Sequence, residues 1–345
     1  MSDQHPDLPP PVAYDAHGAF RERPLAPHEL RAKITPTDKL FMLAHLGLLR
    51  LTPADWRLDV TGLVERPLGL RLPDLARFAP ARVEAVHQCA GNPLTPTVAT
   101  RRVACVEWEG VWLRDVLAEG GIRPEATYVW SDGADAGRFQ GEAVPFFRKD
   151  LPLARLNDEV LLATRVNGDA LPDRHGGPVR LVVPGFYGTN SVKWLWRLTL
   201  ADRRADGLFT TKYYNDDLPE GSRRPVWALA PEAVFVSPAP GEIVFGTVEL
   251  RGWAWGDAPI EHVAVSDDTG MSWQPAQVAP RRGRAWQAWS ADWSPAHPGA
   301  HQLLCKATDA TGTVQPMCDA RNAVHSVEVT VADVGFAAAP CAHPA

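Results

Sequence analysis

The sequence is poor in cysteine: its 345 residues include five, and no two of them form a C-x-x-C pair. The odd number argues against a framework of disulfide bonds. Without C-x-x-C-H there is no covalent haem attachment, and without clustered cysteines there is no iron–sulfur site. Any redox chemistry must therefore use another cofactor.

The sequence also lacks a long apolar run and an excess of basic residues. Its longest apolar run, LFMLAHLGLLRL at 40–51, is well short of the roughly twenty residues of a membrane helix. We expect that run to be buried core. A net charge of −6 without a long basic run gives no footprint for nucleic acid. The N-terminus carries no signal-peptide pattern, so we expect a cytoplasmic protein.

Length and composition predict a folded protein of two domains, since 45% of the residues are hydrophobic and 22% are charged. Residues 1–38 are rich in proline, histidine and charge, and we expect an extended arm on the body. Residues 39–230 mix short strands with helices, without regular βαβ alternation, which predicts an α+β domain. The expected helices are LRLPDLARF at 70–78 and VWLRDVLAEGG at 111–121.

Helical patterns are missing after about residue 230. Alternating strands separated by Gly, Pro and Asp turns predict an immunoglobulin-like β-sandwich over 231–335, followed by a tail at 336–345. Alternation along strands also predicts that the tryptophans of this half belong to the sandwich core or a dimer contact rather than to a binding strip. They are Trp253, Trp255, Trp273, Trp286, Trp289 and Trp293.

One cysteine stands at an unusual place, in VHQCAGN at 86–92. Cys89 follows an apolar strand and precedes a Gly-Asn turn. Free cysteine is often a buried structural residue, and that interpretation stays open here. A strand-end thiolate beside His87 could equally be a nucleophile or a soft metal ligand.

A second group of functional side chains lies in PDRHGGPVRLVVPGFYGTNSVKW at 172–194. His175, Arg180 and Lys193 flank a strand bounded by Gly-Gly-Pro and Pro-Gly turns, which can aim them at one place. Arg offers a planar fork and Lys a point charge, a combination that suits phosphate or another polyanion. The alternative is a solvated loop with ordinary surface charges.

Several segments together resemble the sulfite oxidase family of molybdenum enzymes. QCAGN, NGDALPDRHGGPVRLVVPG, SVKW, RGWAWG and VSDDTGMSWQPA stand in this order and at compatible spacing. The resemblance runs from about residue 56 to 331 and includes the sandwich, which in that family is the dimerisation domain. It implies a molybdenum–molybdopterin cofactor without haem, a homodimer, a small-molecule substrate and a separate electron carrier.

The resemblance also implies roles for individual residues. Cys89 would bind molybdenum through its thiolate, and the hydroxyl of Tyr214 would point toward the metal, although Tyr213 is adjacent. His45 matches the histidine of the family's F-x-R-N-H segment. The residues that would hold the pyranopterin and its phosphate are His45, Asp135, His175, Arg180, Ser191, Val192 and Lys193.

Three positions depart from the family's pattern, in which arginines line the substrate pocket. Leu43, Leu94 and Ser326 stand where the family has arginine. Losing three cations would weaken the attraction and the bidentate fit for an oxyanion. Arg101 and Arg102 could move into the vacancy, but we interpret them as exposed residues at a strand end.

Three functions follow from these observations. The first is a sulfite oxidase-type enzyme that transfers an oxygen atom to sulfite or another small sulfur compound. The second is a reductase of an S-oxide or N-oxide on the same cofactor, which the apolar Leu43 and Leu94 favour. The third is a non-enzymatic interaction protein that has lost its cofactor.

Overall fold

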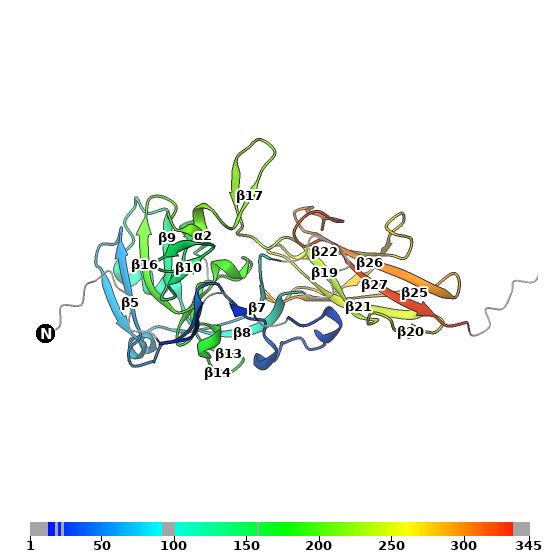
Figure 1. Cartoon of the computed structure of the whole chain (residues 1–345), viewed down its shortest axis with the longest axis horizontal. Coiled ribbons are helices and arrows are strands. Elements are labelled where there is room, and N and C mark those ends of the chain that lie inside the picture. The colour runs from blue at the N-terminus through cyan, green and yellow to red at the C-terminus, as the bar shows by residue number, and fades with distance from the viewer. Residues whose placement is uncertain (1–12, 18–19, 22–23, 92–100, 157–158, 334–345) are drawn as a thin grey trace, which may run out of the picture.

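The computed structural model describes residues 13–17, 20–21, 24–91, 101–156 and 159–333. It shows an elongated molecule with a first domain at one end and a β-sandwich at the other (Figure 1). Most of the described residues lie in strands and loops. The described part contains two α-helices, α1 (Leu113–Gly120) and α2 (Leu208–Thr211). None of its helices has the length and apolarity that a membrane crossing needs.

The first domain is built on two five-stranded sheets. One has the order β12-β9-β16-β5-β6, and its single parallel pair is β16 with β5. These strands are β5 (Arg57–Gly62), β6 (Leu68–Arg71), β9 (Tyr128–Gly133), β12 (Arg148–Pro152) and β16 (Leu195–Ala201). Alternate residues of β5, such as Leu58 and Val60, are fully buried, as the period of a strand requires.

The other sheet carries most of the predicted site. Its order is β14-β13-β8-β7, and β15 also pairs with β13. The strands are β7 (Pro80–Gln88), β8 (Val103–Trp112), β13 (Leu161–Val166), β14 (Asp169–Ala170) and β15 (Arg180–Val182). One apolar core joins both sheets to α1, through residues such as Leu198, Leu162 and Leu117.

One of the two expected helices is wrong. VWLRDVLAEGG contains α1, which ends at Gly120 and is followed by Gly121 with a positive φ of 70°. LRLPDLARF instead begins in β6 and continues as a 3₁₀ helix, η3 (Leu72–Arg77). Pro73 explains the difference, because it has no backbone N–H and disfavours the α conformation at the preceding residue.

Short elements complete the first domain. The segment 13–21 supplies β1 (Ala13–His17) and β2 (Phe20–Arg21), which pair with β4 (Gly47–Arg50) and β3 (Leu43–Ala44). The apolar run at 40–51 is thus core, as expected, and part of the predicted arm adds strands to it. Hairpins are β10 (Gly137–Phe139) with β11 (Glu142–Val144) and β17 (Asn215–Asp217) with β18 (Arg223–Pro225). The 3₁₀ helices are η1 (Pro27–Glu29), η2 (Thr37–Lys39), η4 (Leu153–Arg155), η5 (Asp173–His175) and η6 (Gly188–Asn190).

The second domain is a sandwich of two sheets. Their orders are β19-β21-β25-β24 and β20-β27-β26-β22-β23. The strands are β19 (Glu232–Ser237), β20 (Ile243–Val244), β21 (Val248–Trp255), β22 (Ile260–Ser266), β23 (Gln274–Pro275), β24 (Gln277–Val278), β25 (Gln287–Trp293), β26 (Gly299–Asp309) and β27 (His325–Val331). The immunoglobulin-like character and the domain boundaries stay predictions, and the expected tail lies outside the described residues.

The tryptophans divide between the sandwich and the junction of the two domains. Trp289 and Trp293 belong to the sandwich core. Trp255 and Trp286 instead belong to a cluster that includes Val86 and Val103 of the first domain. Trp253 stacks on Trp286 with a centroid distance of 4.9 Å and packs against the same cluster. The aromatic side chains therefore fix the position of the sandwich on the first domain.

A buried ion pair also crosses this junction. Arg101 Nε donates to Glu232 Oε1 at 2.9 Å, and both side chains are fully buried. The interpretation of Arg101 as an exposed residue at a strand end is therefore wrong. Beside the pair, the side chain of Gln88 donates to Glu232 and to Asn322 and accepts from Trp255 Nε1. Every one of these residues is buried, so the junction contains a buried polar network.

Replacing Glu232 with glutamine should destabilise the protein, because Arg101 would stay buried without its counter-charge. We expect a loss of about 3–5 kcal/mol, measured by urea unfolding. Arg82→Gln is the control, since Arg82 is 67% exposed in its pair with Glu107 and should change stability by less than about 1 kcal/mol. Equal effects of the two variants would contradict a dominant role of the buried pair.

Candidate active site

A cavity lies in the first domain. All nine predicted site residues line it, although they come from segments up to 169 positions apart. They are His45, Cys89, Asp135, His175, Arg180, Ser191, Val192, Lys193 and Tyr214. The two groups that the sequence suggested separately, around Cys89 and around His175, thus face one space. The role of each residue stays a prediction.

Cys89 lies where β7 ends, and its side chain is 8% exposed. Its backbone N–H donates to Arg102 O at 2.9 Å, which continues the pairing of β7 with β8. Its sulfur accepts a hydrogen bond from the N–H of Gly91 at 3.3 Å. The thiol is therefore buried, as the structural interpretation expected, but it borders a cavity instead of filling a hydrocarbon core.

The cationic end of the cavity is held by buried backbone contacts. Arg180 on β15 donates to His175 O at 2.9 Å and to Ser191 O at 2.7 Å. Lys193 Nζ donates to Leu43 O at 2.7 Å. Gly176 has a φ of 100°, and a Cβ there would lie 2.6 Å from the Cβ of Lys193. Only glycine allows this close approach of the two segments.

Burial changes the titration of these groups. It lowers the pKa of His175 to about 3, assisted by the charge of Arg180. Burial and then Arg180 also lower the pKa of Lys193 to about 7, while burial raises that of Asp135 to about 7. Among the described residues that line the cavity, Asp135 is the only carboxylate. A bound anion would therefore relieve the repulsion between these cations.

Tyr214 and His45 form a pair at another part of the lining. Tyr214 OH lies 2.8 Å from His45 Nε2. Burial, followed by the charge of Lys193, lowers the pKa of His45 to about 4, so its ring is neutral at pH 7. Tyr213 points elsewhere and donates to Gln140 Oε1 at 2.6 Å. Tyr214, and not Tyr213, therefore lines the cavity.

The backbone of Tyr214 has a strained conformation. Its φ of 58° lies in the left-handed region, which non-glycine residues seldom occupy. Tyr214 O accepts from Val226 N at 3.0 Å, and the side chain of Asn215 donates to Thr210 O and Tyr213 O. These bonds hold the turn that directs the phenol ring into the cavity, a typical arrangement at functional sites.

His87 and Trp108 are among the lining residues that the predicted site omitted. His87 stacks on Phe41 at a centroid distance of 5.7 Å, and burial lowers its pKa well below 6.5. Strand alternation offered a signal, since residues two apart on β7 point to the same face and Cys89 follows His87 by two. Trp108 left no comparable signal: its ring lies under Arg180, 5.1 Å from the guanidinium carbon.

The three positions that depart from the family's arginine pattern do not all lie at the cavity. Leu43 on β3 lines the cavity. Ser326 on β27 accepts a hydrogen bond from Gln302 Nε2 at 3.0 Å and does not line it. Leu94 lies outside the described residues. Arg102 donates to Gly91 O at 2.7 Å, which brings it next to the Cys89 loop.

Comparison with known proteins agrees with this geometry. Residues 45–209 match the oxidoreductase molybdopterin binding domain, and residues 223–332 match the Mo-co oxidoreductase dimerisation domain. Chicken (Gallus gallus) sulfite oxidase is 31% identical, over 90% of this chain and 74% of its own length. The chain belongs to the sulfite oxidase family of molybdopterin-binding oxidoreductases. The expected fold, a molybdopterin domain followed by a dimerisation domain, is thereby confirmed.

Other members of the sulfite oxidase family show the range of the similarity. Mouse (Mus musculus) mitochondrial sulfite oxidase is 33% identical over 91% of this chain, which spans 64% of the mouse protein. The solved structure of the sulfane dehydrogenase SoxCD from Paracoccus pantotrophus matches with a TM-score of 0.75 and 30% identity. That match covers 87% of this chain and 82% of the other. Relatives of this one fold thus carry names that refer to different sulfur substrates.

The buried histidines should make the apo-protein less stable in acid. The pKa of His175 is about 3 in the folded chain and 6.5 by default, so the unfolded chain binds more protons between these values. Stability is therefore lost as the pH falls below 6.5, by about 2 kcal/mol at pH 5. His175→Asn should reduce the loss between pH 7 and pH 5 by that amount in urea unfolding. The exposed His262→Asn is the control, and identical pH profiles for all three proteins would contradict the assignment.

Proposed function

We propose that the chain is a molybdenum-dependent oxidoreductase that transfers an oxygen atom to sulfite or another small sulfur compound. The observation that carries the proposal is the single cavity that joins Cys89 to His175, Arg180 and Lys193. Family membership supports the cofactor class, and similarity to both sulfite oxidases and a sulfane dehydrogenase supports a sulfur substrate.

The residues of the cavity fit a molybdopterin. Arg180 Nε and Trp108 Nε1 are buried donors without a hydrogen-bond partner among the described residues, and both side chains line the cavity. A phosphate and a polar heterocycle offer the acceptors that such donors need. The described residues contain no group of three or more His, Cys, Asp or Glu side chains that could hold a metal. Cys89 would thus be a single protein ligand, with the remaining sulfur supplied by the pterin dithiolene.

Each residue then has a task in the reaction. When bound, the molybdenum cofactor supplies two-electron redox chemistry and oxygen-atom transfer. Cys89 would fix the metal, while His175, Arg180 and Lys193 would hold the phosphate, with Asp135, Ser191 and Val192 around the pterin. Tyr214 would offer its hydroxyl to the substrate. Neutral His45, 2.8 Å away, would orient that hydroxyl without adding a charge.

Two arginines outside the family's pattern support an anionic substrate. Arg21 on β2 is the cross-strand partner of Leu43, and directly opposed residues project to the same face of a sheet. Burial is the largest cause that raises the pKa of Tyr214, and the charges of Arg21 and Arg102 oppose it. Arg102 also donates to Gly91 O, which places its guanidinium group beside the Cys89 loop. The two arginines would supply part of the attraction that an arginine at position 43 would give.

A reductase of a neutral S-oxide or N-oxide is the second candidate. Leu40, Met42 and Leu43 form an apolar part of the lining, which suits an uncharged substrate. A non-enzymatic interaction protein is disfavoured, because a protein without cofactor gains nothing from keeping dehydrated cations in a cavity.

We further propose a homodimer through residues 231–335, a separate electron carrier and a cytoplasmic location. Of these, the homodimer is supported by the match to a dimerisation domain.

The direct test of the proposed function is Cys89→Ser. We expect the wild-type chain to be purified with molybdenum and pterin, and the variant to fold but to lose most of the metal. Molybdenum is measured by elemental analysis, pterin by fluorescence after release, and folding by circular dichroism. Cys305→Ser, at a fully buried position in the sandwich core, is the control and should keep the metal. A wild-type protein without molybdenum or pterin, from cells that make the cofactor, would refute the proposal.

Substrate charge is tested with Arg21→Gln. We expect the KM for sulfite to rise about threefold to tenfold with little change in kcat, because a charge near the site guides and binds an anion. The turnover of a neutral sulfoxide, with a reduced dye as donor, should not change. Arg251→Gln, at a site 62% exposed on the sandwich, is the control. Tight saturation by sulfite would exclude the reductase, whereas turnover of the sulfoxide alone would establish it.

A further inference from the structure

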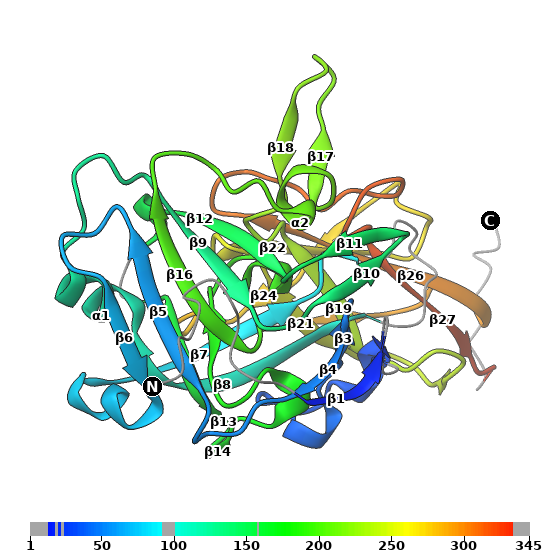
Figure 2. The ribbon, with the colours of Figure 1, turned by 60° about the vertical axis from the view of Figure 1, so that its left-hand side comes forward.

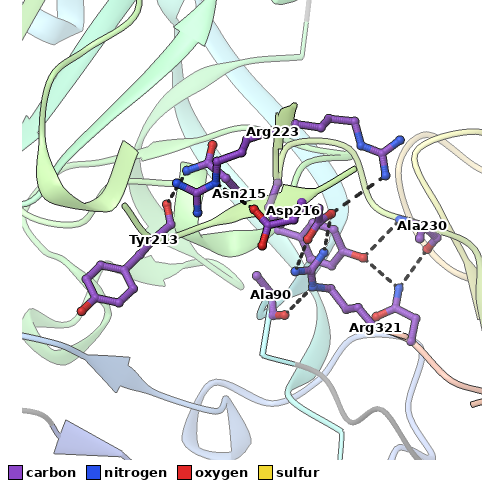
Figure 3. A network of polar contacts seen from close by, with 12 residues as sticks. Ala90, Tyr213, Asn215, Asp216, Arg223, Ala230 and Arg321 are labelled. Atoms are coloured by element: carbon purple, nitrogen blue, oxygen red, sulfur yellow. Dashed lines mark hydrogen bonds and ion pairs between the residues drawn. The ribbon is translucent and has the colours of Figure 1, made fainter. Parts of the chain in front are cut away.

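A side chain of the second domain reaches the loop that carries Cys89. Arg321 lies between β26 and β27, and its Nε donates to Ala90 O at 2.7 Å. Ala90 directly follows Cys89 in the sequence. Figure 3 shows the guanidinium group of Arg321 between the segment of Ala90 and that of Asp216. No motif in the sequence pointed to this contact.

The contact with Ala90 O determines where the next N–H points. A peptide group is planar and trans, so the carbonyl of Ala90 and the N–H of Gly91 point in opposite directions from one rigid unit. That N–H donates to the sulfur of Cys89 at 3.3 Å. Arg321 therefore holds one end of a peptide group whose other end faces the thiol. A cationic donor also polarises the peptide group, which strengthens the second hydrogen bond.

The same guanidinium group binds the segment that carries Tyr214. Its two terminal nitrogens donate to the carboxylate oxygens of Asp216 at 3.2 and 2.9 Å, and Asp216 follows Tyr214 by two residues. A bidentate pair of this kind fixes the plane of the guanidinium as well as its position. Arg321 thus connects the segments of two predicted site residues that are far apart in the sequence.

The backbone next to Arg321 is held by the hydrogen bonds of a buried neighbour. The neighbouring Asn322 is fully buried and donates to Tyr187 OH at 3.0 Å and to Ala230 O at 3.2 Å. Its side-chain oxygen accepts from Gln88 Nε2 at 3.0 Å. Gln88 precedes Cys89, so both neighbours of the cysteine are bound by residues 321 and 322. Side chains with this support keep their geometry, unlike those on a free loop.

We propose that Arg321 is a positioning residue for Cys89: it orients the Ala90–Gly91 peptide toward the sulfur and so directs the thiol into the cavity. The second domain would then contribute to the metal centre as well as to dimerisation. The orientation of the peptide group can be tested in the apo-protein. Its consequence for molybdenum rests on the proposed function.

The first experiment uses the apo-protein. Arg321→Gln removes the positive charge and the guanidinium group that makes the bidentate contact. We expect hydrogen–deuterium exchange of the Gly91 amide to become about tenfold faster, because its hydrogen bond weakens. Arg321→Lys can make one of the contacts and should lie between wild type and Arg321→Gln. Exchange is read by mass spectrometry on overlapping peptides that isolate this amide. Unchanged exchange at Gly91 in Arg321→Gln would overturn the proposal.

Arg284→Gln is the matched control. Arg284 is 17% exposed, against 25% for Arg321, and it also joins the two domains, through Glu159, while it binds Asp257 within the second domain. It does not contact the Cys89 loop through its side chain. If both variants accelerate exchange at Gly91 equally, the effect is a general loosening of the junction, and the specific role of Arg321 is refuted.

The second experiment uses the molybdenum-loaded protein. We expect Arg321→Gln to lose molybdenum about tenfold or more faster than wild type during dialysis. Mutations of residues that hold a metal ligand in place usually have effects of this size. X-ray absorption should show fewer sulfur neighbours around the metal than in wild type, while Arg284→Gln should match wild type. Unchanged metal loss and sulfur number would overturn the role at the metal centre. A wild-type chain that binds no molybdenum would refute the proposed function, while the exchange experiment would still decide on the peptide.

Discussion

The hydrogen bonds at the end of β7 are the constraint on which the site depends. Gln88 is fully buried, its side chain donates to Glu232 and Asn322, and its side-chain oxygen accepts from Trp255 Nε1. A buried polar side chain that loses such partners is strongly destabilising, so β7 has to end in one register against the sandwich. Cys89 is the next residue. Its place beside the cavity therefore follows from contacts made by the residue before it.

The cavity beside the end of β7 brings basic side chains close together, which is electrostatically unfavourable. Buried Arg180 and His175 and half-buried Lys193 surround Asp135, the one carboxylate among the described residues of the lining. Burial opposes the charged form of these basic groups and lowers the pKa values of His175 and Lys193, so His175 is neutral at pH 7. A protein tolerates this only where the surrounding fold is stable enough. The apolar core that joins both sheets, together with the ion pair of Arg101 and Glu232, supplies that stability.

The two domains are consequently one functional unit around the cavity. Arg321, Asn322 and Glu232 belong to the second domain or its entrance, yet they hold residues next to Cys89. The hairpin of β17 and β18 projects from the body (Figure 2), and its first strand carries the Asp216 that binds Arg321. A change in the sandwich can therefore reach the loop of Cys89 through a few direct hydrogen bonds.

The sequence by itself determined the family and the order of the domains. His175, Arg180 and Lys193 stand in one motif whose glycines and prolines fix the backbone, so local signals could predict that these three lie together. Only the resemblance to the family joined Cys89 to them. Most strands could be predicted because alternation of buried and exposed residues is a local property. The helix at 70–78 failed because one proline outweighed a helical pattern.

Only the tertiary structure decided which neighbours act together. It separated Tyr214 from Tyr213, placed Arg101 in a buried pair, set Arg21 opposite Leu43 and brought Arg321 to Ala90. These facts depend on pairing between residues tens to hundreds of positions apart. Such pairing leaves no periodic trace along the chain, because it is fixed by the packing of sheets and domains and not by the preferences of neighbouring residues.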